Sequence, residues 1–276
     1  MALYTPLVKQ IIKVPALPQR PVDGHKGTFG TLSLLAGSPG MLGAAILAAR
    51  GGLRGGAGLC RACLPEELMS PFTIAVPSAT TLPRTSMLRG FFEKTTAAVV
   101  GPGLGTVAET GEQVRLVLRD HEGPIVLDAD GLNLLAPLAG KLTARSPIVL
   151  TPHPGEAARL MKSDSKSLSA DRGATVSDLA AMTGQIVVLK GPGTVVCDGT
   201  RFYRNRTGNS GLATGGTGDV LAGLIGALLC QGMDPFDAAC LGVNIHGKAG
   251  DLIASRLSPS GLCAEDLPLA IAEVMR

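Results

Sequence analysis

One carboxylate, Asp219, stands between a loop of small residues and an apolar run in Thr207–Leu229, TGNSGLATGGTGDVLAGLIGALL. The apolar residues that follow it recur at helical spacing: Val220, Leu221, Leu224, Ile225, Leu228 and Leu229. A helix is therefore predicted after Gly218, with Gly232 as its stop. The four residues 215–218, Gly-Gly-Thr-Gly, would enter its N-terminus, where free N–H groups and the helix dipole bind anions.

Two interpretations of Asp219 are open. An acidic residue in the first helical turn commonly complements the dipole and does nothing else. Alternatively, Asp219 is a general base beside a phosphate that is being transferred, and the small residues before it leave room for a ligand. The loop is not a Walker A motif, because no Gly-Lys-Ser/Thr follows, and GPGLG at 101–105 lacks the spacing of a dinucleotide fingerprint.

Buried strands alternate with helix-period segments along the chain. Continuous Val/Ile/Leu runs bounded by Gly and Pro are typical of strands covered on both faces, and strand–helix alternation indicates a parallel α/β sheet. Strands are predicted at 31–37 and 96–105, helices at 40–52 and 111–121, strand–helix pairs in 124–138 and 146–161, two strands in 185–199, and a helix from Asp234-Pro235. No linker or repeat interrupts the sequence, so one domain is predicted over residues 1–276.

Five segments of polar residues and glycines lie at the ends of predicted strands or in the loop before the apolar helix. Ligands of such sheets bind beyond the carboxyl ends of the strands. The residues expected at this edge are Gly101–Gly105, Asp128–Asn133, Thr151–Glu156, Lys190–Thr194 and Thr207–Asp219.

Composition excludes several classes of protein. Of 276 residues, 45% are apolar and 17% charged, so a large core is available, and the formal net charge of +3 makes nucleic acid or membrane poor partners. Six cysteines include one C-x-x-C pair, Cys60 and Cys63, and are expected to be buried free thiols. The N-terminus lacks a signal-peptide core, and the apolar stretches fall short of the roughly 20 residues that span a bilayer, so a soluble cytoplasmic protein is expected.

The chain resembles the ADP/ATP-dependent NAD(P)H-hydrate dehydratases of the ribokinase-like superfamily. The resemblance covers residues 24 to about 250 and rests on GHKGTFGTLSLLAGSPGMLGAAILAARGGLRGGAGL, VVGPGLG, VLDADGLNLL, LTPHPGE, VVLKG and NRTGNSGLATGGTGDVLAGLIGALL. It implies a single-domain three-layer sandwich with a mostly parallel central sheet flanked by helices. It also implies a stand-alone dehydratase, with the epimerase that some relatives carry on a separate protein.

The resemblance implies repair of a damaged cofactor. Water added to the ring of NADH or NADPH gives a hydrate, and the enzyme removes that water at the expense of ADP or ATP with Mg²⁺. Hydroxide is a poor leaving group, so the hydroxyl would be phosphorylated first and phosphate then expelled.

Site residues also follow from the resemblance. Asp219 would be the catalytic base and contact the substrate, while further substrate contacts would come from Ala44, Ala45, Gly103, Gly105 and His153. The nucleotide would be bound by Lys190, Gly191, Pro192, Gly193, Thr194, Asn209, Gly216, Thr217 and Gly218. Glu156 would act on Mg²⁺ indirectly, although it could equally be an ordinary carboxylate at a helix N-terminus.

Five other polar residues keep open roles. Asp128, Asp130 and Asn133 either line the site or form a turn that caps a helix. His25 and Lys26 either reach a phosphate or lie in an exposed loop.

Two other functions remain possible from the sequence. A vitamin-precursor kinase of the same superfamily would use the same loop and aspartate but release a phosphorylated product. A nucleotide-binding module without catalysis would not need the Gly-Thr-Gly-Asp run at 216–219. The resemblance further implies a homo-oligomer, with a tetramer expected.

Overall fold

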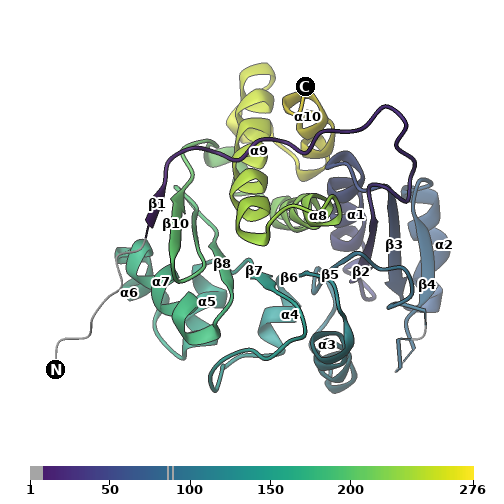
Figure 1. Cartoon of the computed structure of the whole chain (residues 1–276), viewed down its shortest axis with the longest axis horizontal. Coiled ribbons are helices and arrows are strands. Elements are labelled where there is room, and N and C mark those ends of the chain that lie inside the picture. The colour runs from purple at the N-terminus through teal and green to yellow at the C-terminus, as the bar shows by residue number, and fades with distance from the viewer. Residues whose placement is uncertain (1–8, 86, 89) are drawn as a thin grey trace.

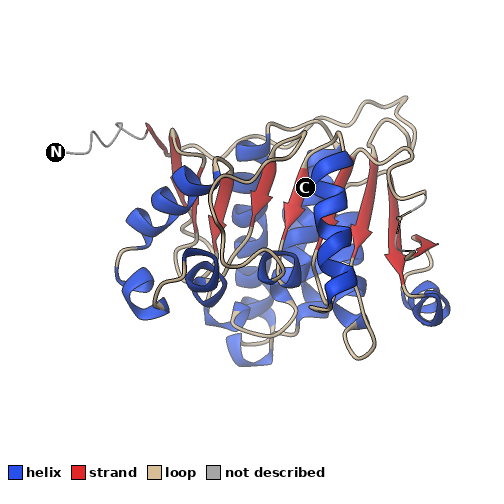
Figure 2. Cartoon of the chain, turned by 90° about the horizontal axis from the view of Figure 1, so that it is seen from below, coloured by secondary structure: helices blue, strands red, loops and turns tan. Residues whose placement is uncertain are grey.

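One open sheet of ten strands organises the chain, whose computed structural model describes residues 9–85, 87–88 and 90–276 (Figures 1 and 2). The strand order is β1-β10-β9-β8-β7-β6-β5-β2-β3-β4. Strands β8 through β4 pair in parallel, and β9 alone runs against its neighbours β8 and β10. The bounds are β1 Lys9–Ile11, β2 Thr31–Leu35, β3 Leu59–Leu64, β4 Thr80–Pro83, β5 Ala97–Val100, β6 Ile125–Leu127, β7 Ile148–Leu150, β8 Ile186–Leu189, β9 Val195–Cys197 and β10 Arg201–Arg204.

Helices cover both faces of this sheet, which confirms the predicted α/β architecture (Figure 1). One face carries α1 Leu42–Arg54, α8 Thr217–Cys230, α9 Pro235–Arg256 and α10 Leu267–Val274, with α2 Glu66–Ala75 beside the β4 edge. The other face carries α3 Ala108–Asp120, α4 Asp130–Asn133, α5 Pro154–Met161, α6 Ser165–Ala170 and α7 Arg172–Thr183.

The central strands are buried on both sides, as their continuous apolar sequences predict. Successive side chains of a strand point to opposite faces. Val126 and Val149 therefore enter the core under α8 and α9, whereas Leu127 and Leu150 enter the core above α3 and α5. All four side chains are fully buried, so an apolar core packs on each face of the sheet, between the strands and the helices.

Helices α1 and α8 approach each other through glycine. A Cβ added to Gly223 of α8 would overlap the carbonyl oxygen of Ala48 in α1, and one added to Gly51 of α1 would overlap the carbonyl oxygen of Val220. No larger residue fits at either position without separating the helices. This contact fixes the N-termini of α1 and α8 relative to each other.

The C-x-x-C pair does not form a redox site. Cys60 and Cys63 lie three positions apart on β3, so their side chains enter opposite cores of the sheet. The expectation of buried free thiols is confirmed for five of the six cysteines but is wrong for Cys263, which is exposed. Within the described part of the chain, no helix is both long and apolar enough to cross a membrane.

Candidate active site

Polar side chains from three adjacent strands meet the N-terminus of α8 at the carboxyl edge of the sheet. Asp128 follows β6, His153 and Glu156 follow β7, and Lys190 follows β8. Asp219 is in the first turn of α8. These residues were predicted to share one edge, and the parallel pairing of β6, β7 and β8 places them there.

Lys190 lies among buried carboxylates. Its Nζ is 2.6 Å from Oδ1 of Asp128 and 3.9 Å from Oε2 of Glu156. Thr151 donates a second hydrogen bond to the same Asp128 oxygen, at 2.8 Å. Burial disfavours the ammonium, but the Asp128 and Glu156 carboxylates outweigh it, and the pKa of Lys190 is raised. The site therefore keeps a fixed positive charge.

Asp219 has the opposite electrostatic character. Its half-buried carboxyl has a pKa raised to about 7, first by burial and then by the negative charge of Asp128, while Lys190 acts in the other direction. A carboxyl with this pKa populates both its protonated and its ionised form near neutral pH. Asp219 can therefore take up and release a proton under physiological conditions.

The first turn of α8 presents backbone N–H groups next to these charges. Gly216, its N-cap, has φ +91°, and no side chain of the described residues caps the helix there. The hydroxyl of Thr217 donates to the carbonyls of Leu212 and Thr214, at 2.8 and 3.0 Å, which folds the glycine loop against the helix. A Cβ on Gly218 would lie 3.2 Å from Nζ of Lys190, so the ammonium borders the same anion site.

Two cavities adjoin at this turn, each of about 420 Å³. The first is lined by Lys190, Gly191, Pro192, Gly193, Thr194, Asn205, Thr207, Gly208, Asn209, Ser210, Leu212, Ala213, Thr217, Gly218, Leu221, Val243, His246 and Gly247. The second is lined by Asp128, Ala129, His153, Pro154, Lys190, Gly191, Leu212, Ala213, Thr214, Gly216, Thr217, Gly218 and Asp219. Six residues line both cavities: Lys190, Gly191, Leu212, Ala213, Thr217 and Gly218. Asp219 lines only the second. A donor in one cavity and an acceptor in the other would thus meet at the α8 N-terminus.

All the predicted nucleotide-binding residues except Gly216 line the first cavity, and Gly216 lines the second. The segment from Lys190 to Thr194 lines it in full, with Gly191 and Gly193 at φ +134° and +61°. Asn209 lines its other wall and donates to Asp251 of α9 at 3.0 Å.

His153 borders the second cavity and also caps α5. Its Nδ1 accepts from the backbone N–H groups of Gly155 and Glu156, at 3.0 and 3.3 Å. Glu156 in return accepts from the His153 N–H at 2.7 Å. Burial lowers the pKa of His153, although the nearby Glu156 carboxylate partly offsets it. Glu156 therefore is a carboxylate at a helix N-terminus, because it caps α5. It also still faces Lys190 in the site, so the proposed indirect role toward Mg²⁺ is compatible with the cap.

The remaining predicted substrate contacts lie farther along the same edge. Gly103 is close to the start of α1, because a Cβ there would lie 2.5 Å from the Met41 carbonyl oxygen and 2.9 Å from Cβ of Ala44. Gly105 donates its N–H to Asp130 at 2.8 Å, and Ala45 is fully buried. None of Ala44, Ala45, Gly103 and Gly105 lines either cavity.

The residues with open roles separate into two groups. Asp128 lines the second cavity, and Asp130 accepts hydrogen bonds from Gly105 and Asn133 beside it. His25 and Lys26 instead precede the amino end of β2, at the opposite edge of the sheet, in an exposed loop.

Two residues that the sequence analysis did not single out belong to the site: His246 and Asp251. Asp251 accepts from Gly208 N–H and Asn209 Nδ2, at 2.8 and 3.0 Å. His246 contacts the Thr217 carbonyl at 2.9 Å. The sequence pattern that could have identified these residues is HGKAGD at 246–251. Its His, two glycines and Asp fall at i, i+1, i+4 and i+5, on one face of a helix.

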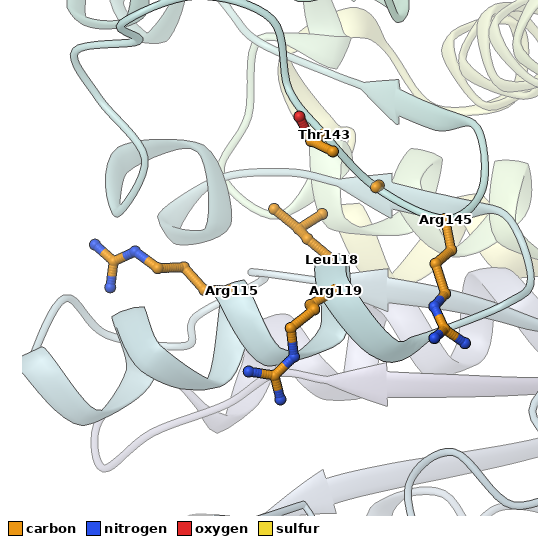
Figure 3. A pocket seen from close by; sticks show the side chains of 6 residues that line it. Arg115, Leu118, Arg119, Thr143 and Arg145 are labelled. Carbon is orange, nitrogen blue, oxygen red and sulfur yellow. The ribbon is translucent and has the colours of Figure 1, made fainter.

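A third hollow, of about 370 Å³, lies at the other edge of the sheet (Figure 3). Arg115, Arg119 and Arg145 surround Leu118 there, at the end of α3 and in the segment before β7. All three arginines are exposed, and two of them pair with the neighbouring carboxylates Asp120 and Glu122. This hollow is a solvated surface remote from Asp219.

Comparison with known proteins identifies close relatives. Residues 32–272 match the family described as NAD(P)H-hydrate dehydratase. The chain is 43% identical over 239 residues to the ADP-dependent (S)-NAD(P)H-hydrate dehydratase of Neisseria meningitidis, which covers 85% of this chain and 80% of that protein. It is 40% identical over 254 residues to a bifunctional NAD(P)H-hydrate repair enzyme of Escherichia coli, covering 91% of this chain but 48% of that protein. The chain thus spans about half the length of the bifunctional relative.

Comparison with solved structures points to the same family. The Bacillus subtilis ADP/ATP-dependent NAD(P)H-hydrate dehydratase, co-crystallised with ATP and Mg²⁺, superposes with a TM-score of 0.87 at 35% identity, covering 94% of this chain and 93% of that one. A ribokinase-like superfamily protein of Enterococcus faecalis superposes with a TM-score of 0.86 at 27% identity, covering 100% and 98%. A hydroxyethylthiazole kinase of Pyrococcus horikoshii, at 16% identity and a TM-score of 0.59, shares the fold alone.

Proposed function

We propose that this chain, which belongs to the NAD(P)H-hydrate dehydratase family, converts hydrated NADH or NADPH back to the reduced cofactor at the expense of ADP or ATP. The observation that carries the proposal is the position of Asp219. Its carboxyl, with a pKa raised to about 7, lines the second cavity next to the anion site that both cavities share.

The first chemical step is phosphoryl transfer. Asp219 removes the proton of the substrate hydroxyl as its oxygen attacks the terminal phosphorus of the nucleotide. The phosphoanhydride bond breaks, and ADP leaves as AMP, or ATP as ADP. The N–H groups of Gly216, Thr217 and Gly218 and the Lys190 ammonium bind the charge on the transferred group.

The second step is elimination. The lone pair of the ring nitrogen expels phosphate from the adjacent carbon, and loss of a ring proton restores the double bond. The chain's contribution is to hold the departing phosphate at the α8 N-terminus, where backbone N–H groups favour the anion. His153 and Ala129, which line the same cavity as Asp219, would confine the nicotinamide ring.

The residues present fit Mg²⁺ bound with the nucleotide. Asp128 and Glu156 are buried carboxylates that already face the cation of Lys190, at 2.6 and 3.9 Å. Within the described ranges, no cluster of three or more metal-ligating side chains occurs, so phosphate and water oxygens must complete the shell. Glu156 would hold Mg²⁺ through water, and the ion would neutralise phosphate charge.

The other site assignments follow from position. Lys190, Gly191, Pro192, Gly193, Thr194 and Asn209 would bind the adenine nucleotide. Ala44, Ala45, Gly103 and Gly105 would lie beside the more distant phosphates of the hydrate, along the α1 N-terminus. For this role Gly105 must exchange its hydrogen bond with Asp130 for one with the substrate.

Several broader features belong to the same proposal. Residues 1–276 would act as one domain of a cytoplasmic homotetramer, and the reaction would be functionally linked to an NAD(P)H-hydrate epimerase activity. The vitamin-precursor kinase is the alternative, but the hydroxyethylthiazole kinase and a pyridoxal kinase of Staphylococcus aureus, at 16% and 17% identity, share the fold alone.

The test is incubation of the protein with enzymatically prepared NADH hydrate, ADP or ATP and Mg²⁺. Return of dihydronicotinamide absorbance supports the dehydratase, whereas phosphorylation of a vitamin precursor without that return supports the kinase. Asp219→Asn should lower turnover by roughly a thousandfold and leave nucleotide binding intact. Unchanged turnover in this variant would exclude Asp219 as the base and would favour a different chemistry.

A further inference from the structure

His246, in the middle of α9, lies directly against the first turn of α8. Its Nε2 is 2.9 Å from the carbonyl oxygen of Thr217, and the residue is 8% exposed. It also lines the cavity assigned to the nucleotide. Nothing in the reaction as described above uses this side chain.

The hydrogen-bond partner determines the state of the ring. A carbonyl oxygen only accepts, so Nε2 of His246 must carry the proton and donate it. Burial lowers the pKa of His246 to about 4; the hydrogen bond to Thr217 acts in the other direction, and the Lys190 charge adds to the effect of burial. At neutral pH the ring is therefore uncharged, with the hydrogen on Nε2.

The Thr217 carbonyl and the Gly218 N–H belong to the same peptide unit. A donor that binds the carbonyl draws electron density toward oxygen and makes the N–H of that peptide a stronger donor. Gly218 N–H is one of the groups assigned to the transferred phosphoryl group. His246 therefore lies on the far side of a peptide whose near side faces the anion.

We propose that His246 is a positioning residue that fixes and polarises the Thr217–Gly218 peptide, and thereby strengthens phosphate binding at the α8 N-terminus. The proposal rests on the proposed function, since it concerns the same phosphoryl transfer. It adds a residue that acts through the backbone and does not touch the nucleotide's transferred group.

The rest of the same α9 face holds the other end of the loop. Asp251 accepts hydrogen bonds from Gly208 and Asn209, and Gly247 contacts Thr207 so closely that a Cβ would overlap its hydroxyl. The loop from Thr207 to Thr217 is therefore attached to α9 at both ends. This makes the anion site depend on α9 even though α9 contributes no N–H group to it.

The test compares two variants by binding and by turnover. His246→Gln keeps an N–H donor near the position of Nε2, whereas His246→Leu removes the donor. Calorimetry gives the Kd for ADP and for AMP, which lacks the phosphate to be transferred. We expect the preference for ADP over AMP to fall roughly five- to tenfold in His246→Leu, with the AMP Kd within about twofold of wild type. The value of kcat should fall by a similar factor, and His246→Gln should recover most of both.

His121→Leu is the matched control, because His121 is also buried but lies at the end of α3, away from both cavities. It should leave the ADP preference unchanged even if it lowers the thermal stability. If His246→Leu fails to fold, His246→Phe, which keeps the ring and lacks the donor, carries the same prediction.

An unchanged ADP preference in the folded donor-free variant would overturn the inference, as would equal losses for ADP and AMP. Failure of His246→Gln to recover the preference would also count against it. These binding results do not depend on the hydrate. A wild-type protein that prefers ADP but does not dehydrate the hydrate would therefore refute the proposed function and leave the role of His246 standing.

Discussion

The Lys190 ammonium and the Asp128 carboxylate meet at 2.6 Å across the carboxyl end of β7, although they follow β8 and β6 respectively. Thr151, at the end of β7 itself, donates to the same carboxylate oxygen. The ion pair thus joins three adjacent strands. It also places one fixed positive and one fixed negative charge beside Asp219, whose pKa responds to both.

Asp128→Asn should move the acidic limb of the kcat–pH profile to lower pH. Burial and the Asp128 charge raise the pKa of Asp219 and Lys190 lowers it, so removal of the Asp128 carboxylate takes away the largest of the charges that oppose Lys190. The limb, expected near pH 7 in the wild type, should fall below 7. The folded state should also lose about 3 kcal/mol, because one partner of a buried ion pair is removed. Turnover between pH 5 and 9 and urea denaturation measure the two effects.

Thr151→Val is the control for that shift. It removes the second hydrogen bond to Asp128 but leaves both charges in place. Its acidic limb should remain near pH 7, whatever happens to its absolute rate. A limb that moves equally in both variants would show that the geometry of the site, and not the Asp128 charge, sets the pKa of Asp219.

The raised pKa of Asp219 should have opposite effects on activity and on stability. The base must be deprotonated, so kcat should increase as the pH rises through about 7. Between the ordinary carboxyl value of 3.8 and 7, the folded state binds this proton more tightly than the unfolded chain does. The contribution of Asp219 to the free energy of unfolding therefore decreases as the pH rises through that interval.

The difference between wild type and Asp219→Asn isolates this contribution. His246, with its pKa lowered from 6.5 to about 4, acts in the other direction and stabilises the fold as the pH rises between those values. Both proteins contain His246, so its effect cancels. Asp219→Asn should gain stability relative to wild type from pH 5 to pH 8 by chemical denaturation. A constant difference would mean that the Asp219 pKa is not raised.

Much of the sheet was predictable because its central strands are buried on both faces. β5, β6, β7 and β8 are short unbroken Val/Ile/Leu/Ala runs, and the structure has strands in each predicted segment. The outer strands gave no such signal. The edge strands are β1 (KQI) and β4 (TTLP), and β10 (RFYR) lies next to β1. Each has exposed or half-buried residues, because the outer part of a sheet is less covered than its centre.

The site was predictable where its residues directly follow a strand or begin a helix. The pairing of Asp128 with Lys190 was not, because the order of strands in a sheet cannot be read from local pattern. His246 and Asp251 were missed for a related reason. They lie on α9, one helix beyond the glycine loop, and reach the site only because α8 and α9 pack together.

Gly223→Ala should destabilise the protein and impair phosphoryl transfer. The new Cβ would overlap the Ala48 carbonyl oxygen and push α8 away from α1. We expect a loss of about 1 to 3 kcal/mol in the free energy of unfolding, with a fall in kcat, because α8, whose N-terminus forms the proposed phosphoryl site, is displaced. Gly43→Ala in α1 is the control for stability. A Cβ there meets nothing within 4 Å, so that variant should be as stable as wild type or more stable by up to about 1 kcal/mol. Equal stability of the two variants would contradict the close helix contact.

One thiol of six should react rapidly with an aromatic disulfide reagent in the native protein. Cys263 is exposed, whereas the other five cysteines are buried. Burial raises the pKa of Cys60 and Cys63 to about 12, which leaves almost no thiolate at neutral pH, and their side chains lie on opposite faces of β3. Cys263→Ser should abolish the fast phase, and denaturant should expose the remaining five thiols. A second fast thiol would contradict the burial of the other five cysteines. A Cys60–Cys63 disulfide, detected by mass spectrometry after mild oxidation, would contradict the position of these two side chains on opposite faces of β3.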